Sequence, residues 1–291
     1  MYEIGHMHEK HIHDAPWLSI ADQAVMARFL DHFRIDRLQP RRALIGSVIH
    51  AFAGIPYENL TKIIKHDILV TPSSAMRYPD ELLADFFAWG TGGTCFSLTA
   101  ALVAVLDAMG IEAYPVLADR HYGPDTHCGV MIPCENNEML LLDPGYLVFE
   151  PIPAPRETPV YIEAGFNRIE LRPLAGGARV ELWTIVKTNR TLRLTFKMEP
   201  VSDEAFGRAW QQSFAFEMMR YPVLTRVKGG SHIYLQGNNL VVRDSQGTLR
   251  QALTPEKEIE YITSTIGIHR DIVLKALERV DYGRSTASAC R

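Results

Sequence analysis

Several features that mark special classes of protein are scarce or missing from these 291 residues. The longest apolar run, Ala100 to Leu106, is far shorter than the ~20 residues that a membrane-spanning helix needs. Four cysteines are too few for a disulfide framework, and the N-terminus lacks the basic patch and apolar stretch of a secretory signal. We therefore expect a cytoplasmic protein that does not associate with membranes.

Charge of one sign is also lacking. The chain has 30 Lys and Arg against 34 Asp and Glu, a formal net charge of −4, and no basic block. Proteins that bind nucleic acid carry such a block or patch, so we expect no nucleic-acid partner. The hydrophobic content of 47% is sufficient for one large core or for two to three smaller ones. Both a monomer and a homodimer are compatible with this composition.

Hydrophobic spacing predicts four successive parts and an α+β fold. Residues 1–110 show helical periodicity and form a helical domain, whereas residues 111–200 contain short alternating strands suited to an antiparallel β-barrel. Residues 201–221 read as one linking helix. Residues 222–291 contain a three-strand meander and closing helices.

One stretch, Gly90 to Leu106, combines three glycines, a cysteine and a long apolar run. The run from Cys95 to Met109 has helical spacing, so Cys95 begins a helix. The positive end of a helix dipole favours thiolate over thiol, and the thiolate is the nucleophilic form. A cysteine on a helix is more often a small buried apolar residue. Its assignment as a nucleophile therefore depends on finding partners.

His127 and Asp143 are the candidate partners of Cys95. A cysteine nucleophile needs a base and a third group that orients the base. His127 begins one predicted strand and Asp143 ends the next, so antiparallel pairing would bring their side chains together. Taken singly, each has an ordinary structural role, as a sheet histidine or a turn aspartate. Taken with Cys95, the three placements favour a catalytic triad.

Other candidates fit less well. Cys128 follows His127, so strand alternation points it into the core on the opposite face. Cys128, Cys134 and His127 lack the paired spacing of zinc ligands, and the four histidines between residues 6 and 13 read as a terminal tail. We therefore expect no metal site. His121 is an alternative base, but it lies in a predicted loop.

Five motifs resemble those of the arylamine N-acetyltransferase family. They run in order through nearly the whole chain: IPYENL at 55–60, TGGTCF at 91–96, THCGVMI at 126–132, LLLDPGY at 140–146 and LVVRD at 240–244. The resemblance implies a Cys-His-Asp triad on Cys95, His127 and Asp143. It also implies a papain- or transglutaminase-like cysteine core, with an N-terminal helical bundle, an antiparallel β-barrel and a C-terminal α/β lid.

The resemblance further implies a ping-pong acyltransferase. An acetyl or other short acyl group would pass from CoA to the cysteine and then to an aromatic amine or hydrazine. Acetyl-CoA would be a co-substrate, with no tightly bound cofactor. We expect Gly123, Thr126 and Phe96 to contact the substrate or CoA.

The chain departs from the family pattern beside the nucleophile. The family has arginine before the two glycines, where this chain has Thr91, so Glu58 either pairs with another cation, such as Arg77, or is solvated. Two other readings remain open. One is a transglutaminase-like or papain-like thiol hydrolase or amide synthase, and the other is an inactive relative that only binds a ligand.

Overall fold

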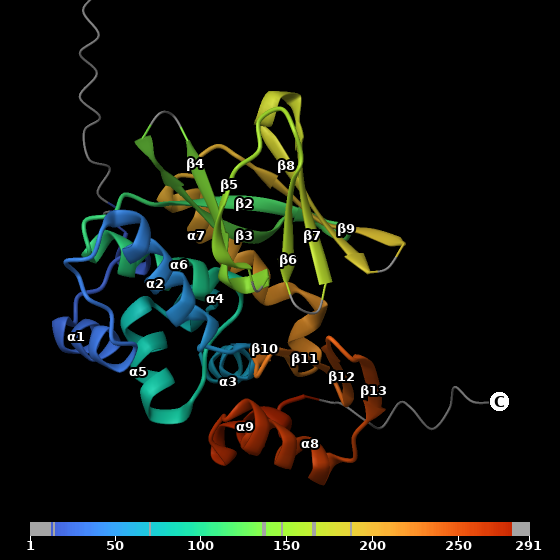
Figure 1. The fold of residues 1–291 in the computed structure, drawn as a ribbon. Helices are drawn as coiled ribbons and strands as arrows, with labels where there is room; N and C mark the ends of the chain where they lie inside the picture. Colours follow the sequence, from blue (N-terminus) through green and yellow to red (C-terminus); the bar gives the residue numbers. More distant parts are fainter. Residues whose placement is uncertain are drawn as a thin grey trace, which may run out of the picture.

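The computed structural model describes residue 13 and residues 15–69, 71–135, 138–146, 148–164, 167–186 and 188–280. Within these ranges the predicted α+β fold is confirmed. Helices fill the N-terminal part, an eight-stranded sheet follows, and a second sheet with two helices ends the chain (Figure 1). His6, His8, His11 and Cys290 lie outside the described residues. His13 is buried, with Nδ1 2.9 Å from Asp203 Oδ1 and Nε2 2.9 Å from the carbonyl oxygen of Ala113, and is therefore not part of a loose tail.

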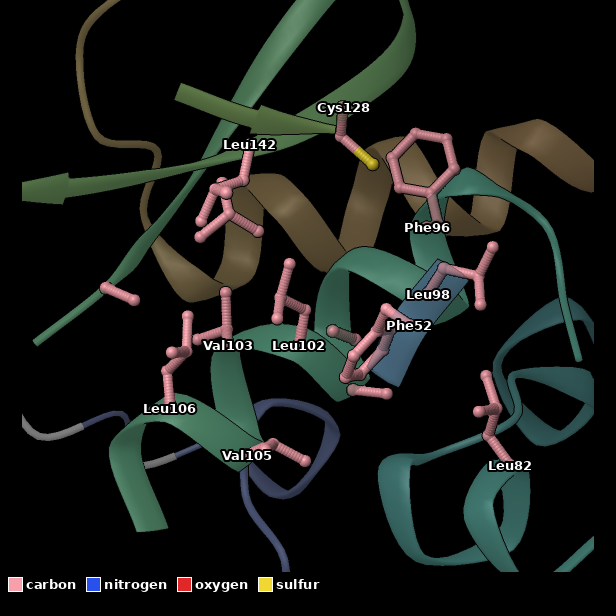
Figure 2. Close-up of a cluster of buried hydrophobic side chains, with 14 of the residues drawn as sticks. Phe52, Leu82, Phe96, Leu98, Leu102, Val103, Val105, Leu106, Cys128 and Leu142 are labelled. Carbon is pink, nitrogen blue, oxygen red and sulfur yellow. The ribbon is translucent and has the colours of Figure 1, made fainter. Parts of the chain in front are cut away.

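The N-terminal helices pack around α6, which begins at the predicted nucleophile and spans Cys95–Ala108. Its residues from Cys95 to Leu106 are all buried, as expected for a helix that is apolar on every side. Figure 2 shows side chains from other elements packed around it, among them Phe52, Leu82 and Leu142. The other elements here are η1 (Pro16–Leu18), α1 (Gln23–His32), α2 (Arg41–Ala53), α3 (Leu60–Ile68), α4 (Pro72–Ala75) and α5 (Pro79–Trp89).

The middle of the chain forms an antiparallel sheet that curls into a nearly closed barrel (Figure 1). Its strand order is β5-β4-β3-β2-β9-β8-β7-β6. The periodicity missed β5, β6 and β7. The strands are β2 (Tyr114–Arg120), β3 (Gly123–Pro133), β4 (Met139–Asp143), β5 (Val148–Pro153), β6 (Val160–Ala164), β7 (Asn167–Leu174), β8 (Arg179–Val186) and β9 (Asn189–Lys197), with the short helices η3 (Pro144–Tyr146) and η4 (Ala175–Gly177) between them.

Strand β3 lies between two cores. Cys128 and Val130 belong to the cluster around α6, whereas Met131 belongs to the barrel interior. His127 also faces the barrel interior, where its ring meets Tyr146 and Phe196. One face of β3 therefore packs against α6 and the other lines the barrel interior.

The linking helix is shorter than predicted. α7 spans Asp203–Gln212 and is followed by two 3-10 helices, η5 (Ser213–Ala215) and η6 (Glu217–Arg220). The hydroxyl of Ser213 donates to the carbonyl oxygen of Trp210 at 2.5 Å, a local side-chain bond of the kind that competes with continuing a helix. The expectation of one helix over 201–221 is wrong in its C-terminal half.

The second sheet has five strands in the order β1-β10-β11-β12-β13. The predicted meander is present, but β10 was missed, and so was β1, which comes from the IPYENL motif. The elements are β1 (Tyr57–Glu58), β10 (Val223–Lys228), β11 (Ser231–Gln236), β12 (Asn239–Asp244), β13 (Gly247–Ala252), α8 (Pro255–Tyr261), the π-helix η7 (Ile262–Ile266) and α9 (Arg270–Leu277). In the described ranges, no helix has both the length and the apolar character needed to cross a bilayer.

Candidate active site

The turn before α6 holds Cys95 against strand β1. The N–H of Glu58 donates to the carbonyl oxygen of Gly93 at 3.0 Å. A Cβ on Gly92 would lie 1.8 Å from the carbonyl oxygen of Pro56, so this position has no room for a side chain. The glycines thus allow two backbone segments to approach each other. Thr94 has an extended backbone before the helix, and its side chain makes no capping bond, so it does not occupy the first N–H groups of α6. The positive end of the helix dipole therefore lies at Cys95.

His127 and Asp143 form a short buried hydrogen bond. Nε2 of His127 lies 2.7 Å from Oδ2 of Asp143, and both side chains are almost completely buried. β3 begins at Gly123, so His127 lies within the strand and not at its start as predicted. The antiparallel pairing of β3 with β4, in which Val130 faces Leu142, brings His127 beside the end of β4. Oδ1 of Asp143 accepts the N–H of Tyr146 at 2.8 Å, which fixes the carboxylate on both oxygens.

Gly145 brings this pair to the cysteine. A Cβ on Gly145 would lie 2.8 Å from Cβ of Cys95 and 3.3 Å from Cε1 of His127. The η3 backbone therefore touches both residues directly. The geometry brings the three predicted catalytic residues together from a helix N-terminus, the interior of β3 and the end of β4.

The pKa of Cys95 is held well below its ordinary value. The main cause is a hydrogen bond from the Cys128 thiol, followed by the charge and hydrogen bond of His127 and the charge of Arg120, while burial opposes the shift. The thiolate is therefore the favoured form of Cys95. The pKa of Cys128 is raised by its own burial and by Cys95, so it stays a protonated donor.

Cys128 is the contact that the sequence missed. Strand alternation placed it correctly in the core, on the face away from His127. Figure 2 shows its side chain pointing from β3 toward the cluster around α6. That face of β3 packs against α6. Cys128 therefore approaches Cys95 from the α6 side of the strand, and His127 approaches it from the barrel side.

Arg120 contacts the second nitrogen of His127. Nη2 of Arg120 donates to Nδ1 of His127 at 2.9 Å, which requires a neutral ring with its proton on Nε2, facing Asp143. Burial alone would lower the pKa of His127, but the charges of Asp143 and Cys95 outweigh burial and Arg120, and the pKa is raised. Before Nδ1 of His127 can take a proton, the hydrogen bond from Arg120 to Nδ1 must break.

Arg77 supplies the cation that Glu58 needs. Nη1 of Arg77 lies 3.5 Å from Oε1 of Glu58, and both side chains are buried. The same nitrogen donates to Thr61 Oγ1 at 2.7 Å and to the carbonyl oxygen of Gly92. Nη2 donates to Asp85 on α5 at 2.7 Å. Arg77 is thus confirmed as the cation that pairs with Glu58 in place of an arginine at position 91. Its bond to Gly92 also fixes the turn before α6.

Of the three residues predicted to contact substrate or CoA, two lie in β3 and one is buried at the start of α6. Gly123 and Thr126 belong to β3 rather than to a loop, because the β2–β3 turn comes earlier and leaves His121 exposed. Thr126 lines a recess beside Cys95. Phe96 also borders this recess, but it is fully buried and its ring packs against Phe206 and Trp210. Their roles in substrate or CoA binding stay predictions.

The recess contains a buried lysine that sequence reasoning missed. Lys62 on α3 is 5% exposed and donates to Ser213, through the carbonyl oxygen at 2.9 Å and through Oγ at 2.6 Å. Its only sequence signal is a charged residue between Thr61 and Ile63, at the start of an otherwise amphipathic helix. Within the described ranges no group of three or more His, Cys, Asp or Glu residues is placed to hold a metal ion.

Of three comparisons with known proteins, the one with solved structures identifies the fold. A scan against protein-family models and a search of curated proteins find no match for this chain. Solved structures do match, and they share one fold.

Three of them span most of this chain. Arylamine N-acetyltransferase from Mycobacterium abscessus has a TM-score of 0.73 and 19% identity over 87% of this chain and 94% of its own. The Bacillus cereus enzyme, described with a Cys-His-Glu catalytic triad, has a TM-score of 0.68 and 18% identity over 85% and 100%. The Mycobacterium marinum enzyme in complex with CoA has a TM-score of 0.72 and 15% identity over 88% and 99%. This chain has the arylamine N-acetyltransferase fold.

Proposed function

We propose that this protein is an acyltransferase of the arylamine N-acetyltransferase family. It moves an acetyl or other short acyl group from CoA to an aromatic amine or hydrazine. The observation that carries the proposal is the buried cluster of Cys95, His127 and Asp143 within this fold. Similar structures include one with a cysteine triad and one in complex with CoA, which supports both the nucleophile and the donor.

The first half-reaction loads the cysteine. The Cys95 thiolate attacks the thioester carbonyl, and the N–H groups at the start of α6 stabilise the oxyanion. The proton lost by Cys95 passes to Nδ1 of His127 once Arg120 has moved off that nitrogen, while Asp143 orients the ring through Nε2. It passes to the sulfur of CoA as that group leaves. Acetyl-CoA is therefore the co-substrate that is consumed and free CoA is released, and a cytoplasmic setting keeps the thiol reduced.

The second half-reaction discharges the cysteine. A neutral amine attacks the acyl carbon of the Cys95 thioester, and His127 takes the proton that the amine loses. Cys95 leaves as a thiolate, which returns the site to its starting state. This order of steps is ping-pong, because CoA departs before the amine reacts.

Intact mass measurement tests the proposal. Incubation with acetyl-CoA should add one acetyl group, which an arylamine such as aniline then removes. Cys95→Ala should abolish the adduct, whereas Cys134→Ala, at a partly exposed thiol 3.6 Å from Arg41 Nη1, should retain it. His127→Asn should slow loading by about 10² to 10⁴-fold. No adduct, combined with amide cleavage that needs no CoA, would instead indicate a thiol hydrolase.

A further inference from the structure

The recess beside Cys95 has a charge pattern that an acetyl group does not use. Its lining includes two cations, Lys62 and Arg120, and no aspartate or glutamate among the described residues. An acetyl group has only a methyl beyond its carbonyl and offers neither cation a partner. The Cys95 thiolate offsets these charges only until it is acylated, and burying an uncompensated charge is costly, so two cations beside the nucleophile indicate an anionic ligand.

Lys62 has a donor to spare. An ammonium group has three N–H donors, of which two contact Ser213, and Nζ lies 4.4 Å from the centroid of the Phe214 ring. The ring accepts no N–H bond as strong as a carboxylate would, so the third donor can serve an anionic ligand. In the part of the chain that the structure describes, no carboxylate lies within ion-pair distance of Nζ. Burial lowers the pKa of Lys62 to about 7, against the opposing charges of Cys95 and Cys128. An anion in contact with Nζ would raise that pKa and restore the full charge.

Arg120 also has unused capacity. Nη2 is engaged with His127, but Nε is buried and has no hydrogen-bond partner among the described residues. A carboxylate accepts two parallel N–H bonds from a guanidinium and is a stronger partner than a neutral imidazole. A carboxylate in the recess would therefore draw Arg120 from His127 and free Nδ1 to accept a proton.

We infer that Lys62 and Arg120 bind a carboxylate at the far end of the acyl group, so that the preferred donor is the CoA thioester of a short dicarboxylic acid. This inference rests on the proposed function. The bonds made and broken are those given above, with the acyl carboxylate unchanged throughout. An acceptor amine could carry the same carboxylate. The acyl group is favoured because it is bonded to the sulfur that lines the recess.

The test compares acyl donors on the full chain. Loading of Cys95 is followed by intact mass with acetyl-CoA, malonyl-CoA and succinyl-CoA, and the second-order rates are compared. The wild type should react at least about tenfold faster with a dicarboxylic thioester, and Lys62→Met should reduce this ratio at least about tenfold. Lys65→Met is the matched control on the same helix. Because Lys65 pairs with Glu81 instead, this variant should leave the ratio unchanged.

Other outcomes separate the possible failures. A wild type that prefers acetyl-CoA, with a ratio insensitive to Lys62→Met, overturns the inference and leaves the proposed function intact. If Lys62→Met instead slows discharge of acetylated enzyme by 4-aminobenzoate but not by aniline, the carboxylate belongs to the acceptor and the acyl assignment is wrong. No loading by any of the three thioesters would overturn the proposed function itself. If Lys62→Met does not fold, as judged by circular dichroism, the wild-type donor ratio decides.

Discussion

At the scale of single residues, the thiolate of Cys95 depends on a neighbour that is itself a cysteine. Cys128 is buried and donates its S–H toward Cys95, which lowers the pKa of one thiol and raises that of the other. The two sulfurs thus divide their roles by environment, one as nucleophile and one as donor. This arrangement gives the site a negative charge close to the positive end of α6.

Removing the Cys128 donor should raise the pKa of Cys95. The Cys128 hydrogen bond is the largest cause of the lowered pKa of Cys95, so Cys128→Ala should raise that pKa toward its ordinary value. Cys128→Ser retains an O–H donor and should shift it less. The pH dependence of Cys95 alkylation, read by site-resolved mass spectrometry, measures the change. An alkylation profile that is the same in Cys128→Ala and in the wild type would contradict the contact.

The sequence predicted the residues of the candidate site better than their surroundings. Cys95 and Asp143 lie at element ends, and His127 lies directly before the apolar residues 128–132 of β3, so a change in the sequence pattern makes all three visible in a single chain. Arg120 and Lys62 are not visible in that way. An arginine at a strand end and a lysine on an amphipathic helix are normally solvated, and only the tertiary packing buries them.

At the scale of elements, Arg77 connects three segments that meet under the site. It reaches Glu58 in β1, Gly92 in the turn before α6 and Asp85 in α5. Thr61 completes the arrangement, because its hydroxyl donates to Glu58 at 2.5 Å while accepting from Arg77. The turn that positions Cys95 is therefore held by a buried charge pair.

Breaking this pair should destabilise the whole turn. Arg77→Met leaves Glu58 buried without its cation and should cost about 3 to 5 kcal/mol of unfolding free energy. Arg168→Met removes an arginine from a pair with Glu163 in which both side chains are largely exposed, so it should cost no more than about 1 kcal/mol. Urea unfolding of the two variants measures the difference. Adding Glu58→Gln to Arg77→Met should recover part of the loss, and strict additivity would count against a direct pair.

Elements that are short or depend on distant partners were the ones missed. β1 has two residues, and it is a strand only because Tyr57 pairs with Thr225 in β10, far along the chain. No local pattern identifies such a strand. By contrast, α6 is long and apolar throughout, and its predicted start and end agree with the structure to within a residue.

At the scale of the whole molecule, the N-terminal and C-terminal parts are interlocked. β1 is an edge strand of the C-terminal sheet, and Leu60 belongs to the same core as Leu235. Arg226 donates to the carbonyl oxygen of Gly54 at 3.0 Å, and the N–H of His269 donates to that of Trp89 at 2.8 Å. These contacts join residues before position 110 with residues after position 221. The predicted domain boundaries at 110, 200 and 221 stay a prediction.

This interlocking predicts that the C-terminal sheet and the candidate site unfold together. Leu235→Ala removes a fully buried side chain of that sheet and should cost about 2 to 5 kcal/mol. It should lower the urea midpoint of alkylation of Cys128, which is fully buried beside Cys95, as much as that of far-UV circular dichroism. Leu249→Ala, at a side chain that is 58% exposed, should change both midpoints little. Separate midpoints for the two probes in Leu235→Ala would show that the parts unfold independently.

The pair of Arg77 and Glu58 also has a consequence for how such chains diverge. A buried carboxylate responds to the distance of a cation and not to the segment that supplies it. The arginine that pairs with Glu58 can therefore change from position 91 to position 77 during evolution, through an ancestor that had arginine at both positions. Among relatives, the two positions should covary, with arginine at one making the other free to change, while glutamate at position 58 stays fixed.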